Sequence, residues 1–265
     1  MRPNLKTEGF WNMAHRGASA VAPANTFAAF EAAVQMGANV IETDVHWTRD
    51  NVLVVAHDDT VDAVSNGSGR IAEMNYKDLL ALDFGYRFTL DEGKTFPFRG
   101  QGVRIPTFYE LLSKMPGIRI NVDLKPEIAH ASSFLRVVAR ANAMHRVVLA
   151  SFHHRTLVEA RQRCPELATS ASTREVVQFL LGLQECSILG QRKPVSYVAL
   201  QVPHRFWGHQ LVNARFVRRA KRQGVAVHVW TVDHPADMER LIALGVNGIV
   251  TNEPNVLKAV LAKQH

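Results

Sequence analysis

The sequence predicts an α/β protein, a (β/α)8 TIM barrel, from three observations. The chain has 265 residues, 47% of them hydrophobic, which suffices for one large barrel. Short β-branched runs alternate with helix-patterned segments along most of its length. The alternation gives eight strand–helix units, the number that closes this barrel. A doubly wound sheet is the alternative, but no glycine-rich phosphate loop follows the first strand.

The expected strands are short and β-branched, and they begin near residues 11, 40, 119, 147, 168, 198, 227 and 249. Thr26 or Asn25 caps the first helix, which Gly37 ends. Capping boxes open two later helices, at Thr107–Glu110 and Ser172–Glu175. The expected helices cover residues 25–36, 107–114, 128–142, 154–163, 172–183, 211–223, 235–244 and 254–263.

Residues 59–104 interrupt this regular alternation. They follow a returning strand at Asn51–Ala56 and are rich in glycine and other turn residues. A stretch this long is usually functional or a small subdomain. We therefore expect one barrel domain over residues 1–265 with an inserted subdomain at about 59–104. Four of its aromatic residues are candidates either for substrate contact or for the insertion's own core: Phe84, Tyr86, Phe96 and Phe98.

Composition restricts the class of partner. The net charge of +7 and the pI of about 9.7 favour anionic partners. The basic cluster at Arg215–Arg222 fits a solvated helix face better than a binding patch. No interleaved basic and aromatic face is visible, which argues against nucleic acid.

The sequence also suggests a compartment. The sequence contains no run of 18 apolar residues, so no transmembrane helix is expected. The N-terminal residues lack the apolar region of a signal peptide. Cys164 and Cys186 have no metal-binding spacing, so free thiols are expected. A reducing, cytoplasmic location is the expectation.

The strand Val40–Trp47 carries the first chemical signal. Its alternation places Glu42, Asp44 and His46 on one face. Two carboxylates are costly to bury without a positive partner. A divalent cation is one such partner, and carboxylate oxygens favour Mg²⁺, Ca²⁺ or Mn²⁺. A solvated edge strand with a polar face is the alternative.

In a barrel, functional residues collect where the strands end. The polar or aromatic residues at these ends are His15, Arg16, Glu42, Asp44, His57, Asp123, Lys125, Ser151, Gln201, Trp230 and Asn252. Three carboxylates suit a hard cation, while arginine and lysine suit a phosphate. Two histidines suit proton transfer to and from oxygen near neutral pH.

The motifs that contain most of these residues resemble those of the glycerophosphodiester phosphodiesterase family. They are His15-Arg16-Gly17, Pro23-Ala24-Asn25-Thr26, Glu42-Thr43-Asp44-Val45, His57-Asp58, Ile105-Pro106-Thr107, Asn121-Val122-Asp123-Leu124-Lys125, Ser151-Phe152, Trp230-Thr231-Val232 and Thr251-Asn252-Glu253-Pro254. The resemblance implies a TIM barrel, a divalent metal, and hydrolysis of a small glycerophosphodiester to an alcohol and glycerol 3-phosphate. It also implies that the insertion shapes the alcohol side of the site.

The resemblance implies a role for each matching position. The acid–base pair would be His15 and His57. The substrate contacts would be Arg16, Lys125 and Trp230. The ligands of Mg²⁺ or Ca²⁺, with Mn²⁺ as a further candidate, would be Glu42, Asp44 and Asp123.

Three positions depart from the family pattern. Ala24 and Asp123 each stand where a glutamate is usual, and Asn252 stands where an aspartate is usual. We interpret Asn252 as the N-cap of the helix at Pro254. The departures bear on substrate and metal preference, and they leave a second reading open: a phospholipase D-like enzyme acting on lysophospholipids or sphingolipids. A non-catalytic phosphate-binding barrel is a third.

The other histidines are expected to have lesser roles. His46 is interpreted either as a residue that supports the site residues from behind or as a rim residue, and His153 and His154 as either surface or substrate-rim residues. His228 is expected to be a hydrogen-bonded histidine in the core.

Overall fold

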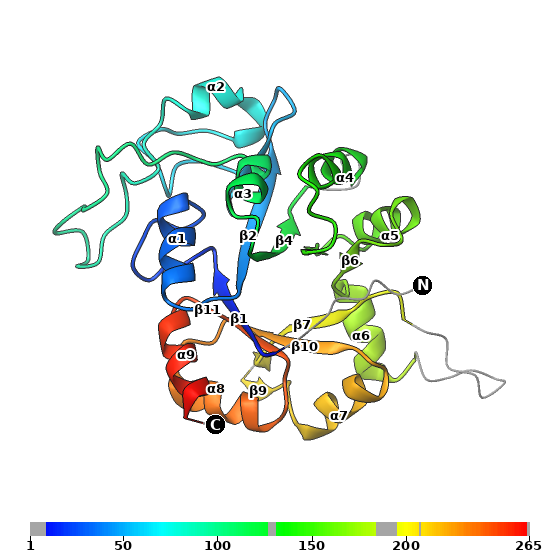
Figure 1. Cartoon of the computed structure of the whole chain (residues 1–265). Coiled ribbons are helices and arrows are strands. Elements are labelled where there is room, and N and C mark those ends of the chain that lie inside the picture. Colours follow the sequence, from blue (N-terminus) through cyan, green and yellow to red (C-terminus); the bar gives the residue numbers. More distant parts are fainter. Residues whose placement is uncertain (1–8, 127–130, 184–194, 207, 264–265) are drawn as a thin grey trace.

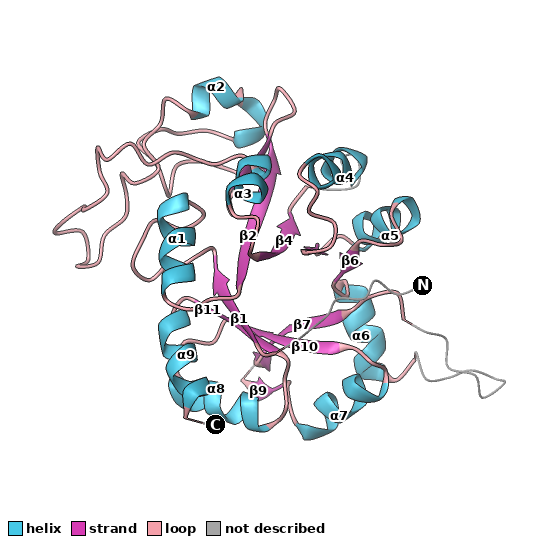
Figure 2. Cartoon of the chain, viewed as in Figure 1, coloured by secondary structure: helices cyan, strands magenta, loops and turns pink. Residues whose placement is uncertain are grey.

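The computed structural model describes residues 9–126, 131–183, 195–206 and 208–263. Among these, eight parallel strands form an inner ring, and helices surround it (Figures 1 and 2). The strands are β1 (Trp11–His15), β2 (Val40–Trp47), β4 (Arg119–Leu124), β5 (Val147–Ala150), β6 (Ala168–Thr169), β7 (Ala199–Pro203), β10 (Ala226–Trp230) and β11 (Gly248–Thr251).

The order of the strands makes the ring. Neighbours run β6-β5-β4-β2-β1-β11-β10-β7, and each adjacent pair is parallel. The two end strands meet through a parallel bridge between Ser170 and Ala199. There the Ala171 N–H donates to the Ala199 carbonyl at 2.8 Å. The predicted TIM barrel is confirmed, and all eight strands lie where the sequence places them.

The helices follow the strands as the sequence predicts. They are α1 (Phe27–Gln35), α3 (Phe108–Lys114), α4 (Ala131–Arg140), α5 (His154–Arg163), α6 (Thr173–Leu181), α7 (Ala214–Arg222), α8 (Pro235–Ala243) and α9 (Pro254–Ala262). Thr26 caps α1, and both predicted capping boxes form. The expected start of α4 near Ile128 lies outside the described residues. The short strands β8 (Arg205–Phe206) and β9 (His209–Gln210) form a hairpin that the sequence did not predict.

Buried side chains separate into an outer and an inner core. Ile41 and Val45 of β2 pack among residues of the outer helices, including Phe30 and Phe108. Another cluster draws on strand residues: Trp11, Met13, Val40, Val148, Ala168 and Val250. Because it contains no helix residue, we place it inside the barrel, as an apolar floor under the strand ends.

The segment after β3 (Leu53–Val55) has a small apolar core. β3 pairs antiparallel with β2, and the segment then forms a short 3₁₀ helix and α2 (Tyr76–Leu79). Its buried residues include Val61, Ile71, Leu79, Phe84 and Ile105. In Figure 1 it lies above α1 and α3.

The four candidate aromatic residues of this segment each pack against other residues of the segment. Tyr86 and Phe96 hold the Arg99 guanidinium between them, at 4.0 and 3.8 Å from the ring centres. Phe98 packs edge-on against Phe88, and Phe84 is buried in the apolar core. These contacts fit the interpretation as the insertion's own core, and substrate contact stays a prediction.

Two further sequence expectations concern membranes and thiols. Within the described ranges, no helix is both long enough and apolar enough to cross a membrane. Cys164 is a free, buried thiol, and Cys186 lies outside the described residues.

Candidate active site

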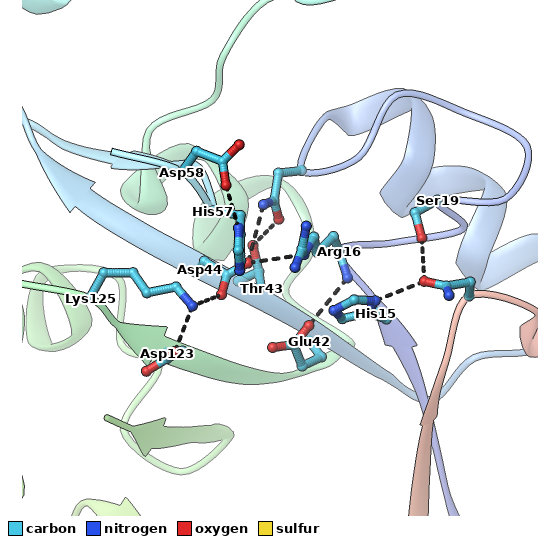
Figure 3. A network of polar contacts seen from close by, with 12 residues as sticks. His15, Arg16, Ser19, Glu42, Thr43, Asp44, His57, Asp58, Asp123 and Lys125 are labelled. Carbon is cyan, nitrogen blue, oxygen red and sulfur yellow. Dashed lines mark hydrogen bonds and ion pairs between the residues drawn. The ribbon is translucent and has the colours of Figure 1, made fainter. Parts of the chain in front are cut away.

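β2 brings two carboxylates to the carboxyl end of the barrel. Glu42 and Asp44 lie on the strand face that carries Val40 in the apolar floor, because side chains alternate along a strand. Both belong to a polar network that includes His15, Arg16 and Lys125 (Figure 3). The alternation of β2 therefore places both carboxylates next to the apolar floor, where they are partly shielded from water.

Lys125, directly after β4, pairs with two acids. Its Nζ lies 2.8 Å from Asp44 Oδ1 and 2.8 Å from Asp123 Oδ2. Burial alone would lower the pKa of Lys125, but the Asp123 and Asp44 carboxylates outweigh it and raise that pKa. The ammonium therefore stays charged and partly neutralises both acids.

Arg16 sits in a turn that ties β1 to β2. Its backbone is left-handed, with φ of 59°, and its N–H donates to the Glu42 carbonyl at 2.9 Å. The guanidinium Nε lies 3.5 Å from Asp44 Oδ2. The next residue must be glycine, since φ is 86° and a Cβ there would meet Ala29 at 2.7 Å.

Asn25 supports the acids from beneath the same turn. Its Nδ2 donates to Asp44 Oδ2 at 3.4 Å, and its Oδ1 accepts from Thr43 at 2.7 Å. Its N–H donates to the Arg16 carbonyl at 2.9 Å. Asn25 is therefore a supporting residue of the site, a role that the expected helix cap did not suggest.

Burial disfavours the charged form of two of the three acids, Glu42 and Asp123. Burial raises the pKa of Glu42 well above its usual range, and the Asp44 and Asp123 carboxylates raise it further. Burial also raises the pKa of Asp123, despite the nearby Lys125 ammonium. Oδ1 of Asp123 is buried with no hydrogen-bond partner among the described residues. Both carboxyls would gain from more positive charge.

That donor set has the chemistry of a site for a hard divalent cation. Within the part of the chain that is described, no three Asp, Glu, His or Cys side chains lie close enough together to coordinate one metal ion as they stand. Lys125 Nζ instead contacts both Asp44 and Asp123. The unpartnered oxygen of Asp123 and the desolvated carboxyl of Glu42 are the observations that fit a cation.

His57 follows β3 and is held by two groups. Its Nδ1 lies 2.7 Å from Asp58 Oδ1, so the ring N–H faces a carboxylate. Nε2 of His46 lies 3.0 Å from the His57 carbonyl and donates to it. His46 thus supports the His57 backbone, which agrees with the first of the two roles expected for it.

His15, at the end of β1, faces a neutral amide. Its Nδ1 lies 2.7 Å from Asn252 Oδ1, and burial lowers the pKa of His15. Asn252 also contacts Asp233, which accepts from its Nδ2 at 2.7 Å. The expected N-cap role is wrong, because the N-cap of α9 is Glu253 and makes no side-chain bond.

The remaining predicted residues lie at different depths. Trp230 ends β10 with 36% of its surface exposed, which places its ring at the mouth. Gln201 donates to Asn121 at 2.6 Å, and Ser151 donates to the Leu124 carbonyl at 2.8 Å. His154 contacts Ser172 at 2.8 Å. Gln201 therefore links β7 to β4, and Ser151 links the end of β5 to β4.

His228 is buried, but the described residues provide none of the hydrogen bonds expected for it. Neither ring nitrogen has a hydrogen-bond partner within the described ranges. The ring instead stacks on Trp11, with 4.8 Å between ring centres. Burial lowers the pKa of His228 to about 4, so it is a neutral core residue.

Comparison with known proteins identifies the family. The model of the glycerophosphoryl diester phosphodiesterase family matches residues 15–256. The chain belongs to this family. It is 32% identical over 257 residues to the glycerophosphodiester phosphodiesterase of Caldanaerobacter subterraneus subsp. tengcongensis, a match that covers 95% of this chain and 97% of the relative. This family member is a phosphoric diester hydrolase.

Solved structures have the same fold. A glycerophosphodiester phosphodiesterase from Agrobacterium tumefaciens gives a TM-score of 0.76 at 23% identity, with 94% of this chain and 98% of that chain covered. A phosphodiesterase from Oleispira antarctica, in complex with its product sn-glycerol-3-phosphate, gives 0.74 at 23% identity, with 94% and 96% covered. The protein described here therefore has the same barrel fold as both.

Proposed function

We propose that this enzyme hydrolyses glycerophosphodiesters to an alcohol and glycerol 3-phosphate, with a divalent cation and two histidines. One observation carries the proposal: the Glu42, Asp44 and Asp123 carboxylates share one end of the barrel with His15 and His57 (Figure 3). The glycerol 3-phosphate bound to the Oleispira antarctica relative supports the choice of product.

The cation would be held by Glu42, Asp44 and Asp123, with Mg²⁺ or Ca²⁺ favoured by their hard oxygens. A bound cation supplies positive charge to the phosphoryl oxygens. Arg16 and Lys125 add fixed positive charge beside it, and Trp230 offers an exposed ring to the substrate. These residues bind and orient the phosphodiester.

The two histidines divide the proton transfers. His15 is the base: it is buried, its Nδ1 faces a neutral amide, and its lowered pKa keeps it unprotonated. His57 is the acid: the Asp58 carboxylate orients its ring through Nδ1, and His57 precedes the insertion that is expected to shape the alcohol side of the site. His15 takes the proton of the attacking oxygen as the new P–O bond forms. His57 gives a proton to the alcohol oxygen as the old bond breaks.

One observation favours a lysophospholipid as a second candidate substrate. Two large aromatic side chains near the strand ends are strongly exposed, Phe152 at 64% and Phe206 at 59%. Phe152 follows β5 and Phe206 lies in the hairpin after β7. An apolar rim of this kind would suit the acyl chain of a lysophospholipid. The reaction would then be of the phospholipase D type.

Product analysis tests the proposal. The purified enzyme is incubated with glycerophosphocholine or lysophosphatidylcholine and with Mg²⁺, Ca²⁺ or Mn²⁺, and phosphorus NMR identifies the product. Glycerol 3-phosphate is expected from the first substrate, and its absence with every cation would refute the proposal. Lysophosphatidic acid from the second substrate would favour the lipid reading. The cytoplasmic location suggested by the cysteine content is part of the proposal and is tested by cell fractionation.

A further inference from the structure

Asn252 connects His15 to a carboxylate that the proposed mechanism does not use. Asn252 Oδ1 is 2.7 Å from His15 Nδ1 and 2.8 Å from Ser19 Oγ. Asn252 Nδ2 is 2.7 Å from Asp233 Oδ2. Asp233 is anchored in turn, since its Oδ1 accepts from Thr251 Oγ1 and from the Asn252 N–H, both at 2.8 Å.

The carboxylate decides which way the amide points. An ionised Asp233 only accepts hydrogen bonds, so the atom of Asn252 that faces it must be the donor, Nδ2. Oδ1 must then face His15. An amide oxygen has two lone pairs, and the hydroxyl of Ser19 and the imidazole supply one proton each.

The same logic fixes the histidine. Because Asn252 Oδ1 can only accept, His15 Nδ1 must carry the proton, and in the neutral ring Nε2 then carries the lone pair. We propose that Asn252, oriented by Asp233, is a positioning residue that holds His15 in the Nδ1–H tautomer and makes Nε2 its proton-accepting atom. This inference deepens the proposed function and rests on it where catalysis is concerned.

The arrangement predicts an unusual response to a single atom change. In Asp233→Asn, Oδ1 still accepts from Thr251 and from the Asn252 N–H, so the new NH₂ group faces Asn252. Asn252 must then turn its oxygen towards residue 233 and its NH₂ towards His15. His15 Nδ1 becomes an acceptor, and the proton moves to Nε2.

A second change should reverse the first. When Asp233→Asn is combined with Asn252→Asp, the carboxylate at position 252 accepts from both neighbours. The Nδ1–H tautomer should return. A purely structural role, holding the loop after β11, would leave the tautomer the same in all three proteins.

Nitrogen NMR measures the tautomer directly. The enzyme is labelled at histidine, and long-range proton–nitrogen spectra are recorded at a pH of about 8, above the ordinary histidine pKa. His15→Gln assigns the signal. Nδ1–H is expected in the wild type and the double variant, and Nε2–H in Asp233→Asn. An Nε2–H wild type, or an Asp233→Asn variant that keeps Nδ1–H while folded, would overturn the proposal.

Kinetics with glycerophosphocholine supply the second readout. Asp233→Asn and Asn252→Leu should lower kcat by about 10²-fold, the lower end of what a positioned base contributes, with little change in KM. The double variant should recover most of the loss. Asp237→Asn, a carboxylate in α8 paired with Arg240, is the matched control and should keep wild-type values.

The two readouts separate the possible failures. If Asp233→Asn does not fold, the tautomer of the wild type and of Asn252→Leu still decides the matter, because loss of the acceptor should release the Nδ1–H preference. If the wild type is inactive on glycerophosphodiesters, the proposed function fails while the NMR result still tests the tautomer. An Nδ1–H wild type whose Asn252→Leu variant retains full kcat would refute the positioning role.

Discussion

Lys125 and Asp44 form an ion pair of 2.8 Å between neighbouring strands, and the same ammonium reaches Asp123. It therefore shares two carboxylates with any cation that binds there. Lys125→Met should raise the affinity for Mg²⁺ or Ca²⁺, because a competing positive charge is lost. It should also lower kcat/KM by about 10- to 100-fold, as expected for a lost charged hydrogen bond to phosphate.

Calorimetry and steady-state kinetics measure these two effects. Lys77→Met, at an exposed position of α2, is the control for loss of one positive charge. Unchanged cation affinity in Lys125→Met would show that the ammonium does not compete with the metal.

Cation affinity should depend on pH through Glu42 and Asp123. Their pKa values are raised, chiefly by burial, so lowering the pH protonates them before ordinary carboxyls. Protonation opposes the cation, and affinity should therefore fall as the pH falls. Titrations in buffers of different ionisation enthalpy should detect proton release on binding. Glu42→Gln should weaken binding and reduce that release; equal release in the variant would exclude Glu42 as its source.

The division of labour between the histidines predicts different responses to the leaving group. An alkoxide needs a proton to depart, whereas nitrophenolate does not. His57→Ala should lose about 10²–10⁴-fold on glycerophosphocholine but far less on a nitrophenyl phosphodiester. His15→Ala should lose activity on both substrates. Both variants are assayed with saturating cation, and equal losses on both substrates for both variants would reject the assignment.

His228 should make stability depend on pH. Its pKa is about 4 in the folded protein and about 6.5 when unfolded, so only the unfolded chain takes up a proton between these values. The contribution of the neutral His228 to the free energy of unfolding is complete above about pH 6.5 and is lost as the pH falls towards 4. The loss amounts to roughly 3 kcal/mol.

Urea unfolding at several pH values tests this dependence. His228→Leu should flatten the fall in the free energy of unfolding between about pH 7 and 4. His145→Leu, at an exposed site, is the control and should keep the wild-type profile. A variant at position 228 with an unchanged profile would show that other groups cause the fall.

Local patterns predicted most of the fold. The bounds of β2 and α5 match the predicted ranges, because alternation, capping and glycine stops act over a few residues. The hairpin β8–β9 was missed since each of its strands has two residues, too few for a period to show.

The site was harder to predict where its contacts are distant. Asn252 precedes Glu-Pro, a local pattern typical of a helix cap, yet its partners are His15 and Asp233, 237 and 19 residues away. No local rule detects such contacts. The surroundings of His228 were equally hidden: its ring stacks on Trp11, far away in the sequence, and its nitrogens have no hydrogen-bond partner among the described residues.

The pairing of β1 with β11 has a consequence for the synthesis of the enzyme. His15 leaves the ribosome well before the amide that holds it, because Asn252 lies 237 residues further along the chain. A nascent chain that already contains every acid, both histidines and Lys125 still lacks this partner. If Asn252 sets the proton-accepting nitrogen of His15 as proposed, that assignment waits until β11 has been translated and has paired with β1, so activity reports that synthesis has passed this strand.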